Sequence, residues 1–229
     1  MIKMLNKKQK YLQIALNSTL EEAKLIIAQL PVDERIIIEV GTPLIKKYGV
    51  QAIKTIKSLW ISRVSMSSKN FYPYVVADLK TMDRGATEVE IAYSGGADAA
   101  IALGTAPIET LNVFVEKCRE LKIDAMIDMM NIDFSLEVLR NLKNLPDVVI
   151  LHRGVDEEKF NPESEIPYHE IHRIKENYDI LVSVAGGDTI QEVQRAIFND
   201  ADIVIVWKHF YESSSEVAKL AQEFLNEIR

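Results

Sequence analysis

The stretch YVVADLKTMDRGATEVEIAYSGGADAAIALGT, residues 74–105, contains a complete strand–helix–strand unit. Short apolar runs at 74–80 and 99–105 predict buried strands, and the 3.6-residue period at 84–95 predicts a helix between them. A helix that joins two apolar strands is the usual crossover between neighbouring strands of a parallel sheet. The stretch therefore predicts a parallel α/β fold.

The same alternation is found along the whole chain. Strands are also predicted at 11–16, 35–41, 124–130, 147–154, 180–187 and 202–207. Helices are also predicted at 19–30, 44–60, 107–122, 135–145, 167–177, 189–199 and 213–227, the last of them starting in Ser213-Ser214-Ser215-Glu216. Eight consecutive strand–helix units are the pattern of a (β/α)8 TIM barrel, so residues 1–229 are predicted to form a single barrel domain.

The connections agree with a barrel rather than an open sheet. A doubly wound sheet normally uses about five or six strands and a Gly-rich phosphate turn after the first strand, where this chain has ALNSTLEEA (15–23). The long loop SRVSMSSKNFYP (62–73) precedes a strand. It is therefore expected on the face of the barrel that serves stability, and no chemistry is assigned to it.

Composition narrows the class of protein. A hydrophobic content of 48% is ample for a large core, and 34 acidic against 27 basic residues give a net charge of −7, which argues against nucleic acid as a partner. The single cysteine, Cys118, falls in an amphipathic segment and is expected to be a core residue in a reducing, cytoplasmic setting. The N-terminal segment lacks the pattern of a cleaved leader, and no apolar run approaches the roughly 20 residues of a membrane span.

The predicted strands end in residues that carry chemistry. In a TIM barrel the active site lies at the C-terminal ends of the strands, because those ends converge around one mouth. The residues at or just after these ends are Glu39, Asp78, Lys80, Asp83, Asp128, His152, Arg153, Gly186 and Gly187. They are predicted to form one site.

Glu39 and Asp78 each follow an apolar run, so both carboxylates are expected to be buried. Two such oxygen donors on adjacent strands favour Mg²⁺ over zinc and leave positions for substrate and water. The alternative is a buried ion-pair network in which these acids pair with Lys80 or Arg153.

Lys80 and His152 are the candidate catalytic groups. Asp78 and Lys80 are two positions apart on an extended segment and should point the same way, while Asp83 follows on the loop or first helical turn. A lysine between acids stays protonated, which suits holding an enolate-like oxygen rather than forming a Schiff base. His152, beside Arg153, is interpreted as a proton carrier, or alternatively as a packed or capping histidine.

The pair Gly186-Gly187 would let backbone amides approach a phosphate, although a tight turn without a ligand would need the same glycines.

With these residues in place, the chain resembles the orotidine 5′-monophosphate decarboxylase suprafamily. Within it the 3-hexulose-6-phosphate synthases are most similar, and their sister branch is the 3-keto-L-gulonate 6-phosphate decarboxylases. The resemblance is carried by LQIAL (12–16), IIEVGTPLIKKYGVQAIKTIK (37–57), VADLKTMDRG (76–85), EIAYSGGADAAIALGTA (90–106), HRGVDEE (152–158) and VAGG (184–187). The segment at 76–85 is the most specific.

The resemblance implies a reaction and a role for each residue. It implies reversible condensation of formaldehyde with D-ribulose 5-phosphate to D-arabino-3-hexulose 6-phosphate, with Mg²⁺ bound by Glu39 and Asp78. Lys80 would hold the enediolate, His152 would move protons, and Asp83 would reach into the site of a partner in a homodimer. A formaldehyde-activating partner is also implied, because some relatives carry one as a fused domain.

The same resemblance implies which residues contact the substrate. These are Asn17, Asp128, Arg153, Ala185, Gly186, Gly187, Trp207 and Lys208. The decarboxylase branch carries a glutamate, an arginine and a threonine at the positions of Asp128, Val155 and Ala185, so the pattern here is that of the synthases.

Three features of the sequence depart from the family pattern. Asn17 stands where an aspartate is usual, Trp207-Lys208 replace the usual glycine and small or basic residue after the eighth strand, and Asp188 replaces an apolar residue. Asp188 beside a phosphate would need to point away, or to be offset by Lys208 or Arg153. The alternatives are therefore the sister decarboxylase, another sugar-phosphate lyase, or a non-catalytic barrel that binds or assembles.

Overall fold

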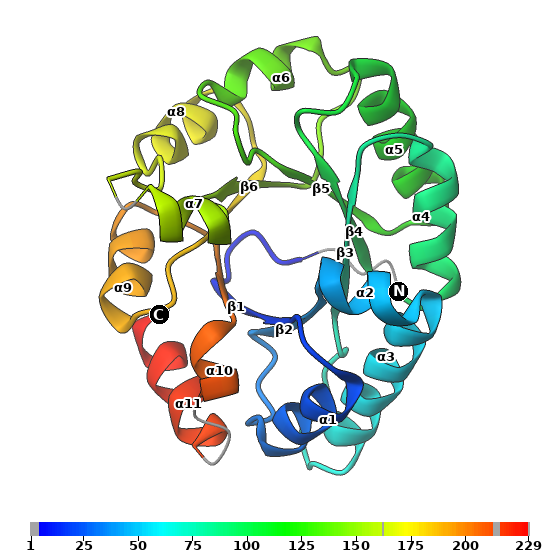
Figure 1. The fold of residues 1–229 in the computed structure, drawn as a ribbon, viewed down its shortest axis with the longest axis vertical. Helices are drawn as coiled ribbons and strands as arrows, with labels where there is room; N and C mark the ends of the chain where they lie inside the picture. Colours follow the sequence, from blue (N-terminus) through cyan, green and yellow to red (C-terminus); the bar gives the residue numbers. More distant parts are fainter. Residues whose placement is uncertain (1–4, 162, 213–215, 229) are drawn as a thin grey trace.

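The predicted barrel is present in the computed structural model, which describes residues 5–161, 163–212 and 216–228. Within those ranges eight parallel strands follow one another around a closed barrel, and pairing of the last with the first completes it (Figure 1). The strands are β1 (Tyr11–Leu16), β2 (Ile36–Val40), β3 (Val75–Thr81), β4 (Ala99–Leu103), β5 (Asp124–Asp128), β6 (Val148–His152), β7 (Leu181–Ala185) and β8 (Ile203–Val206).

Helices surround this barrel (Figure 1). They are α1 (Leu20–Gln29), α2 (Thr42–Tyr48), α3 (Val50–Ser65), α4 (Gly85–Ser94), α5 (Ile108–Leu121), α6 (Ser135–Asn141), α7 (Val155–Phe160), α8 (His169–Asn177), α9 (Ile190–Phe198), α10 (Lys208–Glu212) and α11 (Val217–Glu227). Every predicted strand and helical segment has its counterpart, so the strand–helix order was predicted correctly.

Several boundaries differ from the prediction. The single helix expected at 44–60 is two helices, because Gly49 has φ +63°, a left-handed conformation that ends α2 before α3 begins. Helix α3 continues to Ser65, so the first residues of the loop expected at 62–73 are helical. Helices α7 and α10 were not predicted, since one or two turns are too short to show a period. The helix start at Ser213–Ser215 lies outside the described residues.

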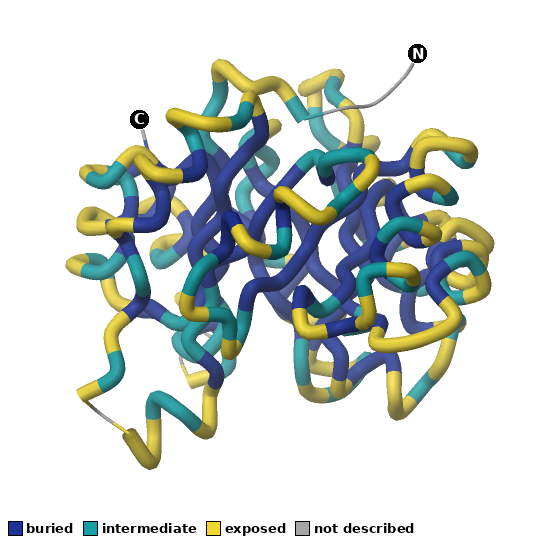
Figure 2. The backbone as a smooth tube through the Cα atoms, turned by 90° about the horizontal axis from the view of Figure 1, so that it is seen from above, coloured by how far each residue is buried: buried dark blue, intermediate teal, exposed yellow. Residues whose placement is uncertain are grey.

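The core has two parts. One lies inside the barrel and is built from inward-pointing side chains at alternate strand positions, such as Ile37, Val76 and Met126. The other lies between the outward faces of the strands and the helices, around Trp60 and Phe114. Because both faces of each strand are covered, the central strands are buried and the loops form the exposed rim (Figure 2). Cys118 is a free, buried cysteine in this outer part, as predicted.

The segment before β3 contributes to stability, as expected for that face of a barrel. The Lys57 ammonium donates hydrogen bonds to the Tyr72 hydroxyl at 2.9 Å, to the Pro73 carbonyl at 2.8 Å and to Asp98 Oδ2 at 2.5 Å. These bonds tie helix α3, the incoming loop and the start of β4 together on the face away from the predicted site. In the described part of the chain, no helix is both long and apolar enough to span a membrane.

We predict that Gly85→Ala lowers the free energy of unfolding by about 1–3 kcal/mol, a typical effect of overpacking. Gly85 begins α4, and a Cβ atom there would lie 2.7 Å from the Thr110 carbonyl oxygen and 3.0 Å from the Phe114 amide nitrogen. Urea unfolding followed by circular dichroism measures the change. Thr87→Ala, at an exposed position of the same helix, is the control and should change stability by less than about 0.5 kcal/mol. Equal stability of the two variants would contradict the close contact between α4 and α5.

Candidate active site

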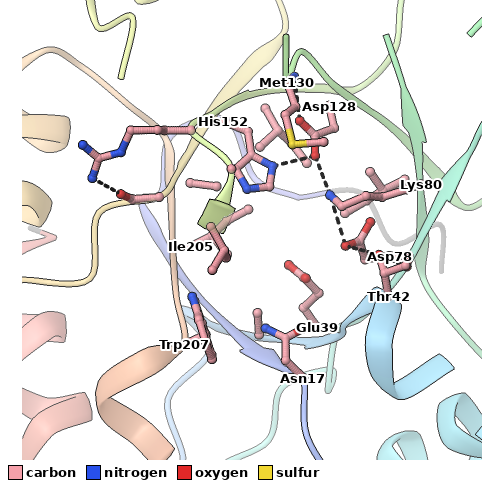
Figure 3. A pocket seen from close by; sticks show the side chains of 18 of the residues that line it. Asn17, Glu39, Thr42, Asp78, Lys80, Asp128, Met130, His152, Ile205 and Trp207 are labelled. Atoms are coloured by element: carbon pink, nitrogen blue, oxygen red, sulfur yellow. Dashed lines mark hydrogen bonds and ion pairs between the residues drawn. The ribbon is translucent and has the colours of Figure 1, made fainter. Parts of the chain in front are cut away.

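A cavity of about 460 Å³ opens at the C-terminal ends of the strands, and every strand of the barrel contributes a lining residue. Most of the predicted site residues line it. They are Asn17, Glu39, Asp78, Lys80, Asp128, His152, Arg153, Ala185, Gly186 and Trp207. Their side chains approach one another from strands that are far apart in the sequence, as Figure 3 shows for those that it labels.

Three predicted residues do not line the cavity. Asp83 is exposed on the loop between β3 and α4, so within one chain it lies outside this space. Gly187 packs against α9, where an added Cβ would lie 2.8 Å from Glu192 Cβ. The Lys208 ammonium is 3.5 Å from Glu158 Oε1 on α7. Neither residue lines the cavity in this structure, so the predicted contact of Gly187 and Lys208 with substrate stays a prediction.

The carboxylate of Asp128 joins the two candidate catalytic groups. Its Oδ2 accepts a hydrogen bond from Lys80 Nζ at 2.7 Å and lies 2.7 Å from His152 Nδ1, while its Oδ1 accepts the Met130 N–H at 2.9 Å (Figure 3). Burial acts to raise the pKa of Asp128, but His152 and Lys80 outweigh it and lower that pKa to about 2. Asp128 is therefore an ionised acceptor that orients both partners.

Ionised Asp128 also determines the tautomer of His152. A carboxylate without a proton only accepts hydrogen bonds, so Nδ1 of His152 must carry the hydrogen that it shares with Asp128. In the neutral ring the other nitrogen, Nε2, is then free to accept a proton. This places a proton acceptor, oriented by a buried acid, in the wall of the cavity.

Lys80 reaches the cavity by a different route from the one predicted. It was expected on a regular extended strand, but β3 is irregular between Ala77 and Thr81, and Lys80 has φ +46°. Such a conformation is uncommon for a residue with a side chain, and it recurs where a bulge turns a side chain toward a functional site. Burial opposes its charge, yet Asp78, 3.4 Å away, and Asp128 hold the pKa of Lys80 above its ordinary value. A raised pKa agrees with the protonated lysine that the sequence predicts.

The two predicted metal ligands are buried on the neighbouring strands β2 and β3. Burial and the charge of Asp78 raise the pKa of Glu39 above its ordinary value. Asp78 Oδ1 is buried without a hydrogen-bond partner in the described structure. Two buried carboxylates on neighbouring strands favour a cation between them, so these donors fit Mg²⁺.

The protein itself would supply few ligands to such a cation. Among the described residues no group of three or more His, Cys, Asp or Glu side chains is arranged to hold a metal. Two carboxylates together with water and substrate oxygens are a common way to bind Mg²⁺. The alternative ion-pair network is present only in part, because Lys80 contacts Asp78 while Arg153 lies 3.5 Å from Glu192 instead.

Sequence reasoning missed two polar residues that hold these acids. Gln13 is fully buried on β1 and its Nε2 donates to Glu39 Oε2 at 2.5 Å. The Thr42 hydroxyl, at the start of α2, donates to the carbonyl of Asp78 at 2.9 Å or to its Oδ2 at 2.8 Å. The signal for Gln13 was its inward position in the alternating strand YLQIAL, where a polar side chain needs a partner.

Asn17 lies at the end of β1, where its backbone N–H donates to the Tyr211 hydroxyl at 2.8 Å. Its side chain occupies the space beside Gly41, since a Cβ at that glycine would lie 1.8 Å from Asn17 Oδ1. Gly186 has φ +99° and an added Cβ would overlap the carbonyl oxygen of Arg153. Both glycines are therefore required by the packing of the mouth.

Two of the three departures in the sequence, Asp188 and Trp207-Lys208, follow β7 and β8. Asp188 was expected either to point away from a phosphate or to be offset by Lys208 or Arg153. Lys208 pairs with Glu158, and Arg153 donates to the carbonyls of Ser164 and Gly186. Asp188 accepts hydrogen bonds from backbone amides at the end of β8 instead. Among the described residues, neither Lys208 nor Arg153 pairs with Asp188, so the second alternative is not met.

Comparison with known proteins agrees with this architecture. The model of the orotidine 5′-phosphate decarboxylase / HUMPS family matches residues 10–222, which is most of the chain. The chain belongs to this family. A bifunctional enzyme Fae/Hps from Methanothrix thermoacetophila is 36% identical over 221 residues, which cover 96% of this chain and 53% of that relative. The chain thus spans about half the length of the curated relatives that it matches.

Solved structures of the family superpose on nearly the whole chain. A 3-hexulose-6-phosphate synthase from Salmonella typhimurium is 29% identical, with a TM-score of 0.79 over 95% of this chain and 99% of that one. KGPDC from Streptococcus mutans has a TM-score of 0.76 over 96% of this chain and 97% of that one. At 20% identity the second likeness supports the fold alone.

We predict that Glu39→Gln stabilises the metal-free protein at neutral and alkaline pH. Because the folded pKa of Glu39 is raised, its ionisation destabilises the folded state as the pH rises above the ordinary value of 4.5. The variant should melt roughly 2–4 °C higher than the wild type at about pH 8 in chelator, the shift that about 1 kcal/mol gives in a domain of this size. This gain should vanish near pH 4, where Glu39 is protonated in both states.

Calorimetry in EDTA across this pH range measures the difference. Glu116→Gln, an exposed position on α5, is the control and should show no pH-dependent gain. A Glu39→Gln protein that is less stable at every pH would show that the carboxylate is a structural partner of Gln13 rather than a strained acid.

Proposed function

We propose that this chain is an Mg²⁺-dependent aldehyde-lyase that reversibly joins formaldehyde to D-ribulose 5-phosphate and forms D-arabino-3-hexulose 6-phosphate. The observation that carries the proposal is the arrangement of Lys80 and His152 on the Asp128 carboxylate, beside the acid pair of Glu39 and Asp78. Its second support is the similarity to a synthase of that name, at 29% identity over nearly the whole of both chains.

The acids and the lysine would act on the ketose oxygens. Glu39 and Asp78 would hold Mg²⁺, which when bound supplies positive charge for a developing enediolate. The Lys80 ammonium, held by Asp78 and Asp128, faces the same space and would stabilise the oxyanion by charge and hydrogen bonding. Because Asp128 preorganises it, Lys80 needs little rearrangement during the reaction.

His152 would carry the proton in both half-reactions. Its Nε2 would accept the proton from C1 of the ketose, and the enediolate carbon would then form the new C–C bond with the carbon of formaldehyde. The oxygen of formaldehyde would take the proton back from Nε2. Asp128 would stabilise the imidazolium between these two transfers, since it lies 2.7 Å from Nδ1. The reverse reaction uses the same groups.

Aldol chemistry is favoured over decarboxylation by three residues. Asp128, Val155 and Ala185 all line the cavity, where the sister branch of the resemblance carries a glutamate, an arginine and a threonine. The non-catalytic alternative is disfavoured because a binding subunit has no need of a strained lysine and two buried acids.

Partners and setting belong to the same proposal. Since the relatives named Fae/Hps are about twice as long as the matched region, we infer that a Fae protein supplies formaldehyde to this barrel as a partner. A homodimer would bring Asp83, exposed on its own chain, into the neighbouring site. The free buried thiol of Cys118 agrees with a cytoplasmic setting.

The proposal is tested by turnover of ribulose 5-phosphate and formaldehyde with Mg²⁺, with EDTA as the metal control. Activity should be lost in EDTA and restored by Mg²⁺, and Lys80→Ala should lower turnover by at least about 100-fold, as expected for losing a charge that faces an oxyanion. Lys219→Ala, an exposed lysine of α11, should leave turnover unchanged. Full activity in chelator would contradict the metal role, and turnover of 3-keto-L-gulonate 6-phosphate alone would favour the sister reaction.

Mixing inactive subunits tests the role of Asp83. If Asp83 completes the partner's site, a dimer of Lys80→Ala with Asp83→Ala has one site with both defects and one site with neither. Random exchange should therefore restore about one quarter of wild-type activity, because half of the dimers are mixed and each has one intact site. Subunit exchange demonstrated by mass, with no recovery of activity, would place Asp83 outside the mechanism of the partner.

A further inference from the structure

The side chain of Asp188 accepts hydrogen bonds from two backbone N–H groups just after β8, a pair of donors that could otherwise bind an anion. Asp188 follows Gly186-Gly187 after β7 and is 8% exposed. Its Oδ1 accepts the backbone N–H of Trp207 at 2.6 Å and that of Lys208 at 3.2 Å. Two consecutive amides thus point at one carboxylate oxygen, beside a cavity that Trp207 itself lines.

This place is where barrel enzymes bind phosphate. The loops after the seventh and eighth strands present backbone amides toward a phosphate group in many TIM barrels. A carboxylate and a phosphate are both anionic oxygen acceptors, so they compete for the same N–H groups. The carboxylate of Asp188 is tethered to the site and needs no binding step, which gives it the advantage of a high effective concentration.

The two cationic side chains of the same region, Arg153 and Lys208, already have acidic partners. Arg153 lies 3.5 Å from Glu192 Oε1, and its guanidinium donates to two backbone carbonyls. The Lys208 ammonium lies 3.5 Å from Glu158, whose charge also acts on Asp188. A phosphate arriving here would meet three carboxylates, and each of these two cations already has an acidic partner.

We propose that Asp188 is a specificity-determining residue that opposes a phosphate group at the β7–β8 end of the cavity. The inference rests on the proposed function. The proposed reaction uses Lys80 and His152, which line the opposite end of the same cavity. The wild-type pocket then binds the phosphate of a ketose weakly and discriminates little between a ketose phosphate and the same ketose without phosphate. The substrate class of this pocket is then a short ketose whose phosphate-bearing end contributes little binding energy.

Binding of inorganic phosphate tests this directly and requires no turnover. Titration calorimetry at constant ionic strength compares the wild type with Asp188→Ala, Asp188→Asn and Glu158→Gln. Asp188→Ala frees both amides and should bind phosphate at least about tenfold more tightly, roughly the effect of one charge-assisted hydrogen bond. Asp188→Asn keeps the acceptor and loses the charge, so its gain should be smaller but measurable.

Glu158→Gln is the matched control, because it removes the same charge from the same region and leaves the bonds of Asp188 to the amides in place. A gain in Glu158→Gln equal to that in Asp188→Ala would overturn the proposal in favour of general electrostatics. Unchanged phosphate binding in a folded Asp188→Ala or Asp188→Asn protein, checked by circular dichroism, would also overturn it.

Kinetics separate this inference from the proposed reaction. With ribulose 5-phosphate, Asp188→Ala should lower KM by at least about tenfold with little change in kcat, while kcat/KM for unphosphorylated ribulose stays the same. An equal change for both sugars would contradict a role at the phosphate end. Absence of turnover with every substrate would count against the proposed reaction only, since the phosphate titration still decides the role of Asp188.

Discussion

The buried carboxylate of Asp128 is the interaction on which the organisation of the site depends. A charge with almost no contact with water must be compensated by hydrogen bonds, and Asp128 obtains them from Lys80, His152 and the Met130 amide. The same bonds hold a cation and a proton acceptor at fixed positions in one cavity. A single desolvated anion at the end of β5 thus links the ends of β3 and β6 into one chemical unit.

The residues around Asp128 lower the stability of the folded protein, and the same features suit a reactive site. Glu39 and Asp78 lie together with little solvent, and Lys80 adopts a left-handed backbone conformation to reach Asp128. The rest of the barrel offsets this loss of stability, because its strands are buried on both faces and its opposite end is held by the hydrogen bonds of Lys57. This division of labour between the two ends is typical of the fold.

The two ends of the cavity itself also differ in what they offer a substrate. The side of β2, β3, β5 and β6 presents acids, a lysine and an oriented histidine, which suits carbanion chemistry next to a carbonyl group. The side of β7 and β8 holds amides that Asp188 already occupies and an aromatic ring, Trp207, where a phosphate group would be expected. The two ends of the cavity thus differ in chemistry, with ionised and proton-accepting groups at one end and engaged backbone amides at the other.

The sequence by itself determined the barrel, because buried strands and amphipathic helices leave periodic patterns that do not depend on distant contacts. It also placed Glu39, Asp78, Lys80, Asp128 and His152 at one mouth, since the ends of parallel strands converge. It did not show the break at Gly49, the bulge at Lys80 or the short helices α7 and α10, which depend on local backbone conformation. The bonds of Gln13, Asp128 and Asp188 were decided only by the tertiary structure, because each joins residues from different strands or from the loops that follow them, whose separation no sequence spacing encodes.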